Sequence, residues 1–199
     1  LAYLVGEREF CGLHLIVTPA VLLPRPDTAP LVEWAIQPMP AQSAPPKPRL
    51  ADLGTGSGAI ALALKHALPQ AEVHASDASA AALAVAFANG ERLALPVLWH
   101  LGSWFDALPA ALRFDLVVSN PPYVAPGDPH LTALAHEPIG ALVPDADDGA
   151  GLADVVRIAS GAVARLNPGG WLLVEHGAEQ GEAVRRVLMQ AGLTNVATR

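Results

Sequence analysis

Four consecutive residues, Asn120, Pro121, Pro122 and Tyr123, follow an apolar run and have the chemistry to bind a flat amide or amine group. The prolines have fixed φ angles and give no backbone N–H to a sheet, so a strand must end before them. The carbonyl groups of such a stiff segment are free of sheet pairing and can accept hydrogen bonds from a ligand. A loop that only closes a strand is the alternative interpretation of two adjacent prolines.

The nitrogen of an amide or aryl amine attacks an electrophilic methyl group poorly, because its lone pair is shared with a π system. Two acceptors aimed at its N–H hydrogens can hold it in line and favour the charge that develops on it. The side-chain oxygen of Asn120 and the main-chain oxygen of Pro121 can form that pair, with Tyr123 packed on the flat group. No strong base is needed, since the proton becomes acidic once the methyl group has arrived.

A second candidate segment lies between an apolar run and a helical pattern. It consists of small residues: Gly54, Thr55, Gly56, Ser57 and Gly58. Its glycines allow a tight turn and a close approach of a ligand to the backbone. Asp77 ends the next apolar run, where a carboxylate can accept hydrogen bonds from both ribose hydroxyls. The spacing also fits a dinucleotide pattern with Ala59, so it predicts a nucleoside ligand without separating NAD from S-adenosylmethionine. A purely structural glycine turn is the alternative.

Alternating strands and helices are expected to position both segments. The predicted strands are residues 49–54, 71–77, 96–100, 114–119 and 171–176, with a sixth beginning in 194–199. The predicted helices carry apolar stripes (Ile60, Leu64, Leu68; Val155, Ile158, Ala159, Ala162, Val163; Val184, Val187, Leu188, Ala191), and another helix is expected to stop at Asn89 and Gly90. This alternation of strands and helices predicts an α/β fold with a doubly wound, mostly parallel sheet. Such sheets bind ligands beyond the carboxyl ends of their strands, where both candidate segments lie.

The first part of the chain has a different pattern. Residues 9–17 alternate apolar and polar positions around Gly12, which predicts an N-terminal β-hairpin arm. Residues 22–36 enter a short helix with Asp27 or Thr28 as its cap. Residues 37–49 form a proline-rich connector.

The amino-acid composition bears on the compartment of the protein and on whether it binds nucleic acid or membranes. The 199 residues carry a net charge of −7 and one cysteine, Cys11, which is expected to be a small buried side chain in a reducing compartment. The acidic balance argues against a large nucleic-acid footprint. The apolar stretches are too short to span a membrane, and no secretory leader pattern opens the chain.

Several other candidates are weaker. The seven histidines show no metal-ligand spacing, so no metal site is expected. The acidic run at residues 144–154 lacks the glutamate that a calcium loop needs, because Val156 stands at that position. Glu137 either shapes a lid or is a surface residue, and Trp104 either contacts adenine or is a core aromatic. Glu175 and His176 are expected to be structural.

The motifs together resemble those of a known family. "YLVGEREF", "LLPRPDT", "DLGTGSGAIALAL", "SWFDAL", "VSNPPYV", "HEPIGALV", "LNPGGWLLVEHG" and "QGEAVR" follow one another along the chain. In this order they resemble the bacterial protein-glutamine N5-methyltransferases that modify the GGQ loop of class-one peptide chain release factors (the PrmC/HemK family). The resemblance covers nearly the whole chain, and the combination of "PRPDT" with "NPPY" is specific.

The resemblance implies a Rossmann-like class I methyltransferase fold and S-adenosyl-L-methionine as cofactor. Residues 54–58 and Asp77 would hold the cofactor, with Trp104 near the adenine. Asn120 would contact cofactor and substrate, and residues 120–123 would bind the glutamine amide. Residues 1–48 would form the hairpin, the PRPDT loop and the connector, and residues 49–199 the cofactor-binding methyltransferase domain. We expect a cytoplasmic monomer that acts on release factors, with no sequence-specific nucleic acid or membrane as partner.

The chain departs from the family pattern at three positions. Ala29 stands in place of a glutamate, Ser103 in place of an aspartate, and Cys11 in place of an aromatic residue. By the resemblance, we also expect the family's N-terminal helical domain and its final C-terminal strand to be missing.

Alternative functions stay open at this point. The same N-P-P-Y chemistry serves methylation of exocyclic amines on DNA or RNA, which predicts a basic surface and a steep salt dependence. A non-catalytic fragment that binds S-adenosylmethionine is a second alternative. NAD-linked oxidoreduction is a third, although no hydride-handling site is visible.

Overall fold

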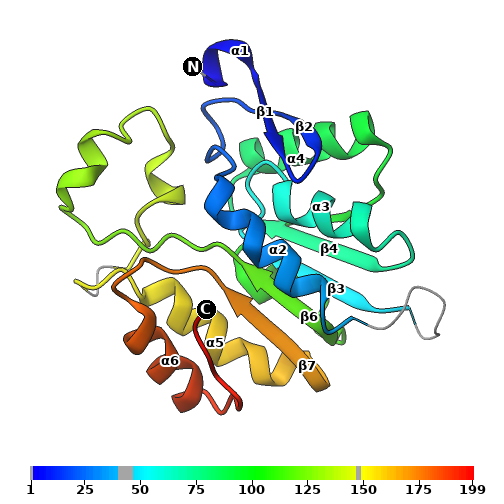
Figure 1. Ribbon diagram of the computed structural model, residues 1–199, viewed down its shortest axis with the longest axis vertical. Coiled ribbons are helices and arrows are strands. Elements are labelled where there is room, and N and C mark those ends of the chain that lie inside the picture. The colour runs from blue at the N-terminus through cyan, green and yellow to red at the C-terminus, as the bar shows by residue number, and fades with distance from the viewer. Residues whose placement is uncertain (1, 40–46, 147–148) are drawn as a thin grey trace.

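A parallel five-stranded sheet forms the centre of the computed structural model, which describes residues 2–39, 47–146 and 149–199. Its strands are β3 (Arg49–Leu53), β4 (Glu72–Asp77), β5 (Leu98–Leu101), β6 (Phe114–Ser119) and β7 (Leu166–Val174). They lie in the order β5-β4-β3-β6-β7 (Figure 1). The chain runs outward from β3 through β4 to β5 and then returns to the other side of β3, so the predicted doubly wound sheet is confirmed.

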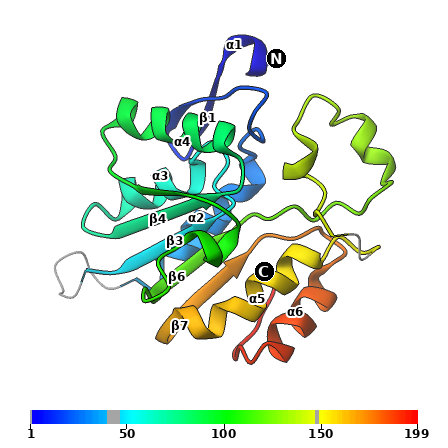
Figure 2. The same ribbon diagram turned by 180° about the vertical axis from the view of Figure 1, so that it is seen from behind.

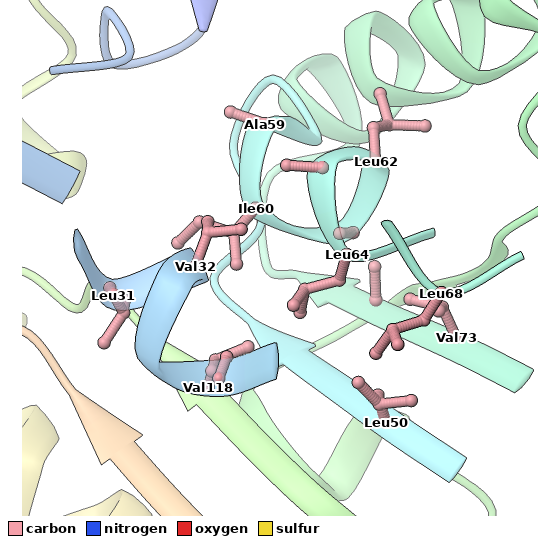
Figure 3. Packing of buried hydrophobic residues seen from close by; sticks show 14 of the residues in the cluster. Leu31, Val32, Leu50, Ala59, Ile60, Leu62, Leu64, Leu68, Val73 and Val118 are labelled. Atoms are coloured by element: carbon pink, nitrogen blue, oxygen red, sulfur yellow. The ribbon is translucent and has the colours of Figure 1, made fainter. Parts of the chain in front are cut away.

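Helices cover the sheet on both faces. They are α2 (Ala29–Ile36), α3 (Ala59–Ala67), α4 (Ala80–Leu93), α5 (Ala153–Arg165) and α6 (Gly181–Gln190), with a short α1 (Ala2–Val5) and the 3₁₀ turns η1 (Pro26–Thr28), η2 (Trp104–Ala107), η3 (Pro129–Thr132) and η4 (Ile139–Ala141). One cluster of buried residues joins α2 and α3 to the sheet, and a second joins α5 and η2 to it. Figure 3 shows the first cluster, in which α2 and α3 face Leu50 and Val118.

The predicted hairpin arm is confirmed as β1 (Glu7–Phe10) paired antiparallel with β2 (Leu13–Ile16). Cys11 and Gly12 form its turn with φ angles of 49° and 79°, as tight hairpins require. Cys11 is exposed, so its predicted burial is wrong: it lies at the tip of the turn, where no core is within reach. Phe10, Leu13 and Leu15 instead fill the same cluster as α2 and α3.

Asn89 and Gly90 do not end a helix, contrary to the prediction. Helix α4 begins after Ser79, whose side chain accepts a hydrogen bond from the Ala82 amide, and continues to Leu93. Asn-Gly is a stop signal when nothing else satisfies its polar groups. Here tertiary partners satisfy the amide of Asn89, which is fully buried, so the helix passes through it.

Two further expectations, one for the C-terminal tail and one for helix α5, are wrong. Residues 194–199 are described and form no strand, because the tail is held by side chains rather than by a backbone ladder. Arg185 donates to Thr198 Oγ1 at 3.0 Å, and the guanidinium of Arg199 lies 5.8 Å from the ring centre of Trp34. Val163, expected on the buried stripe of α5, is 49% exposed.

Strand β7 begins earlier than predicted and takes in Asn167 to Gly170. A Cβ atom on Gly170 would lie 3.0 Å from the Phe114 carbonyl oxygen, so only glycine lets the chain run close to β6 here. Most of the proline-rich connector (40–46) and part of the acidic run (147–148) lie outside the described residues. Among those described, no helix is long and apolar enough to cross a membrane.

Candidate active site

The glycine turn after β3 is bound to the end of β4. Gly54 and Thr55 donate their backbone N–H groups to the Ser76 carbonyl oxygen, each at 2.9 Å. Gly56 donates its N–H to Asp77 Oδ2 at 2.8 Å. The turn therefore places backbone and carboxylate side by side at the carboxyl edge of the sheet, as the sequence predicted.

The three glycines of this turn all have positive φ angles but differ in the space around them. A Cβ atom on Gly54 would lie 3.1 Å from the Trp104 ring, and one on Gly58 would lie 3.1 Å from Leu62 and Trp99. No protein atom lies within 4 Å of a Cβ atom on Gly56, where φ is +55°. Gly56 is thus the glycine of this turn with open space around its α-carbon, whereas the α-carbons of Gly54 and Gly58 lie against neighbouring side chains.

Asp77 keeps hydrogen-bonding capacity at the strand end. Its Oδ1 accepts from the Ser79 N–H at 2.8 Å, and its Oδ2 accepts from Gly56. Burial raises the pKa of this carboxyl, and the two backbone hydrogen bonds oppose that rise. Each oxygen retains a second lone pair, so both can also accept from the hydroxyls of a ligand.

Asp52 is a further candidate residue of the site, which the sequence patterns did not single out. It is fully buried in β3, and its Oδ2 accepts from Thr55 Oγ1 at 2.6 Å and from the Ala61 N–H at 3.1 Å. Its Oδ1 is buried without a hydrogen-bond partner in the described structure, and burial raises the pKa of the group to about 7. An acidic residue inside a buried strand, directly before a glycine turn, is the signal that would have found it.

Trp104 lies against the glycine turn and in the core at once. It has a φ angle of 47°, and its carbonyl oxygen accepts from Ser76 Oγ at 3.2 Å. Its ring contacts the Gly54 position and packs on the cluster of α5 and η2. The adenine contact and the core aromatic, opposed in the sequence analysis, are therefore compatible.

Asn120 begins a turn that lies beside the glycine turn. Leu53 pairs with Ser119 in the parallel register, and Ser119 Oγ donates to the Leu53 carbonyl at 2.7 Å. The next residues, Gly54 and Asn120, therefore start neighbouring turns. The Nδ2 group of Asn120 donates to Thr28 Oγ1 at 3.2 Å, so the amide oxygen is the end left for a ligand.

Tyr123 is held by its backbone. Its carbonyl oxygen accepts from Gln180 Nε2 at 2.9 Å. A Cβ atom on Gly151 would lie 2.3 Å from the same oxygen, so the chain passes too close for any side chain there. Burial, and next the charge of Glu175, raise the pKa of the tyrosine hydroxyl, which stays neutral at physiological pH.

A long segment between β6 and α5, containing η3 and η4, projects from this edge of the sheet (Figures 1 and 2). Glu137 fastens it to the loop before α2. Its side chain is only 6% exposed, forms an ion pair with Arg25 and accepts from the Leu23 N–H at 3.2 Å. Of the two interpretations of Glu137, the structure favours the one in which it shapes this segment.

A groove of about 1440 Å³ runs along β7 and reaches the candidate site at Tyr123 and Glu175. Gly56, Asp77 and Asn120 are not among its lining residues. The position of this groove therefore does not mark the glycine turn, which is a candidate site because of the strand ends and polar groups that meet there. Among the described residues, no cluster of three His, Cys, Asp or Glu side chains is arranged to hold a metal ion.

Asn89 links the hairpin arm to the glycine turn. Its Nδ2 donates to the carbonyl oxygens of Ile16 and Ser57, both at 3.0 Å, and its Oδ1 accepts from the Ile16 N–H at 2.7 Å. The role of this residue was missed because its partners are distant in sequence.

Asn89→Ala is expected to lower the free energy of unfolding by about 2–3 kcal/mol, since it leaves buried backbone groups without partners. Denaturant unfolding measures this loss. Asn167→Ala, which removes one hydrogen bond to Asp115 at 2.7 Å in a less buried place, is the control and should cost less than about 1 kcal/mol. Equal losses in the two variants would contradict the linking role.

Comparison with solved structures identifies the type of fold. The catalytic domain of hMettl16 in complex with MAT2A 3′UTR hairpin 6 aligns with a TM-score of 0.68 at 20% identity, over 94% of this chain and 69% of that one. The 16S rRNA methyltransferase of T. thermophilus in complex with AdoMet and guanosine aligns with a TM-score of 0.64 at 23% identity, over 93% of this chain and 44% of that one. The Rossmann-like class I methyltransferase fold is thereby confirmed.

Comparison of sequences is more specific. Residues 35–140 match the family described as methyltransferase small domain. Release factor glutamine methyltransferases from Bordetella pertussis and Escherichia coli are 53% and 46% identical to this chain over all of its length, covering 72% and 70% of theirs. One from Xylella fastidiosa is 52% identical, over all of this chain and 70% of its own. Because such identity extends from the hairpin through the glycine turn and the N-P-P-Y turn to the last helix, this protein belongs to the family of release factor glutamine methyltransferases.

Proposed function

We propose that this protein transfers a methyl group from S-adenosyl-L-methionine to the side-chain amide nitrogen of the glutamine in the GGQ motif of release factors. The observation that carries the proposal is the hydrogen bond from Asn120 Nδ2 to Thr28. With its Nδ2 end held by Thr28, the amide oxygen of Asn120 is the end available to a substrate, and Asn120 follows β6 beside the start of the glycine turn. The names of the relatives support the same reaction.

The residues present fit the cofactor. The Gly56 backbone is open, and the Asp77 carboxylate has lone pairs for two hydroxyls. Asp52 lies beneath the turn with an unpartnered oxygen, and a carboxylate there suits a ligand with positive charge. When bound, S-adenosylmethionine supplies a methyl group on a positively charged sulfur. Residues 54–58, Asp77 and Trp104 are proposed to hold it.

Asn120 and Pro121 are proposed as the acceptor pair for the substrate amide. Asn120 Oδ1 and the Pro121 carbonyl oxygen would each accept one N–H hydrogen, which orients the nitrogen and favours positive charge on it. Pro122 keeps the segment stiff, and the Tyr123 ring would cover the flat amide. The nitrogen gains a methyl group and loses one proton to water.

The proposal extends to partner and place. Release factors are the proposed protein partner, and the cytoplasm the proposed place of action, because translation termination occurs there. We propose a monomer as the active form, since a single chain carries both turns of the site. The division into a part before residue 49 and a methyltransferase domain after it also stays a proposal.

Competing acceptors test the reaction. The protein is incubated with labelled S-adenosylmethionine and, separately, with a purified release factor, the same factor with its GGQ glutamine changed to alanine, total RNA and DNA. We expect label, and a mass increase of one methyl group, in the unchanged factor alone. Label in RNA or DNA would favour the exocyclic-amine alternative. Cofactor binding by calorimetry with no labelled acceptor would favour the non-catalytic alternative.

A further inference from the structure

We propose that Thr28 and Glu175 are positioning residues that set the orientation of the Asn120 side chain by holding its Nδ2 end. The inference deepens the proposed function and rests on it for its catalytic consequence. The orientation itself is a property of this chain alone. Thr28 lies before α2 and Glu175 follows β7, so two distant segments meet behind the N-P-P-Y turn.

The Asn120 amide has two distinct ends. Rotation by half a turn about its last bond exchanges an oxygen that accepts hydrogen bonds for an NH₂ group that donates them. An NH₂ group presented to the substrate amide would place donor against donor. The site therefore needs an acceptor behind Asn120 that holds its Nδ2 end, and Thr28 Oγ1 lies there at 3.2 Å.

The Thr28 hydroxyl is available for this purpose. Thr28 occupies the N-cap position of α2, where the sequence predicted a capping side chain, yet it makes no side-chain capping bond. The residue is 4% exposed, so water does not compete strongly for its hydroxyl. Its backbone N–H donates to the Arg25 carbonyl oxygen at 3.1 Å, which fixes the position of the residue.

A hydroxyl that accepts from Asn120 has its own proton to donate, and Glu175 is the acceptor at hand. The Glu175 N–H donates to the Ser119 carbonyl at 3.0 Å, which places this residue beside the turn. Its Oε2 is buried and has no hydrogen-bond partner among the described residues. The pKa of Glu175 is raised by burial, and hydrogen bonds from Thr28 and Asn120 oppose that rise. Both bonds are donated to the carboxyl group, so the Thr28 hydroxyl proton and the Asn120 NH₂ group face Glu175.

The decisive variant is Thr28→Val, which keeps the shape of the side chain and removes the hydroxyl. We expect the hydrogen exchange of the Asn120 side-chain NH₂ group, measured by NMR without cofactor or acceptor, to become about fivefold to tenfold faster. We expect kcat for release-factor methylation to fall about tenfold with the cofactor Kd unchanged. Thr28→Ser restores the hydroxyl and should restore both quantities.

Matched variants separate orientation from stability. Thr18→Val removes another threonine hydroxyl, which accepts from the Ala20 N–H at 3.3 Å, and should change neither quantity. If Thr28→Val fails to fold, Glu175→Ala can be used instead. It removes the carboxyl group behind Thr28 and Asn120 and should also make the hydrogen exchange of the Asn120 NH₂ group faster. Unchanged exchange in the Thr28 or Glu175 variant, or no rescue by serine, would overturn the inference. Should the wild-type protein methylate no release factor, the proposed function fails while the exchange measurement still decides the orientation.

Discussion

Asn120→Ala is expected to lower kcat for release-factor methylation about a hundredfold to a thousandfold. This is the usual cost of removing one hydrogen-bonding group that acts on the charge developing in a transition state. The side-chain oxygen of Asn120 is the proposed acceptor for the substrate N–H, and alanine offers none. The Pro121 carbonyl oxygen stays in place, so some activity should survive. Single-turnover assays with labelled cofactor measure the loss.

The same substitution far from the site is the control. Asn167→Ala, at the opposite end of the sheet, should leave kcat within about twofold of the wild-type value. The midpoint of thermal unfolding shows whether Asn120→Ala has lowered kcat through loss of structure. A fully folded Asn120→Ala variant with near-normal kcat would remove the acceptor pair from the mechanism.

Gly56→Ala is expected to weaken binding of S-adenosylmethionine at least about tenfold, or 1.4 kcal/mol. The added methyl group meets no protein atom within 4 Å, so it enters the open space where the backbone of the turn is proposed to meet the cofactor. Calorimetric titration measures the change in Kd. The change should be larger for Gly56→Val, whose side chain is bulkier.

The backbone conformation of Gly56 adds a cost that must be separated from the loss of ligand contact. Alanine at a positive φ angle costs about 1–2 kcal/mol of stability at any site. Gly169 has a φ angle of 79° and equally open surroundings, but it lies at the start of β7, away from the strand ends. Gly169→Ala should therefore lose similar stability and bind the cofactor normally. Weakened binding in both variants would assign the effect to strain.

Local patterns were sufficient to predict the sheet and the hairpin. The runs before Gly54 and Asn120 are short and mostly apolar, as strands buried on both faces must be. Their alternation with helical stripes left few possible topologies, because crossovers between parallel strands are right-handed. The hairpin followed from the alternation of Leu13 and Leu15 around Gly12, and both side chains are buried.

Predictions failed where distant partners override a local signal. Asn89 and Gly90 form a helix stop in isolation, but Ile16 and Ser57 satisfy the Asn89 amide and the helix continues. Residues 194–199 have a strand-like composition, yet a strand exists only where a neighbour offers a backbone ladder. Thr28 looked like a helix cap, and its hydroxyl pairs instead with Asn120.

The sequence by itself determined the alternation of parallel strands and helices, the two turns at the carboxyl ends of strands and the membership in a methyltransferase family. These properties depend on residue types and spacings within short windows, where steric limits and apolar periodicity act directly. Only the tertiary structure shows that Thr28 accepts a hydrogen bond from the Nδ2 end of the Asn120 amide, because Thr28 reaches it from a segment far away in the chain. Hydrogen-bond direction depends on which acceptor lies within about 3 Å, and that proximity exists only once the sheet and α2 have packed together.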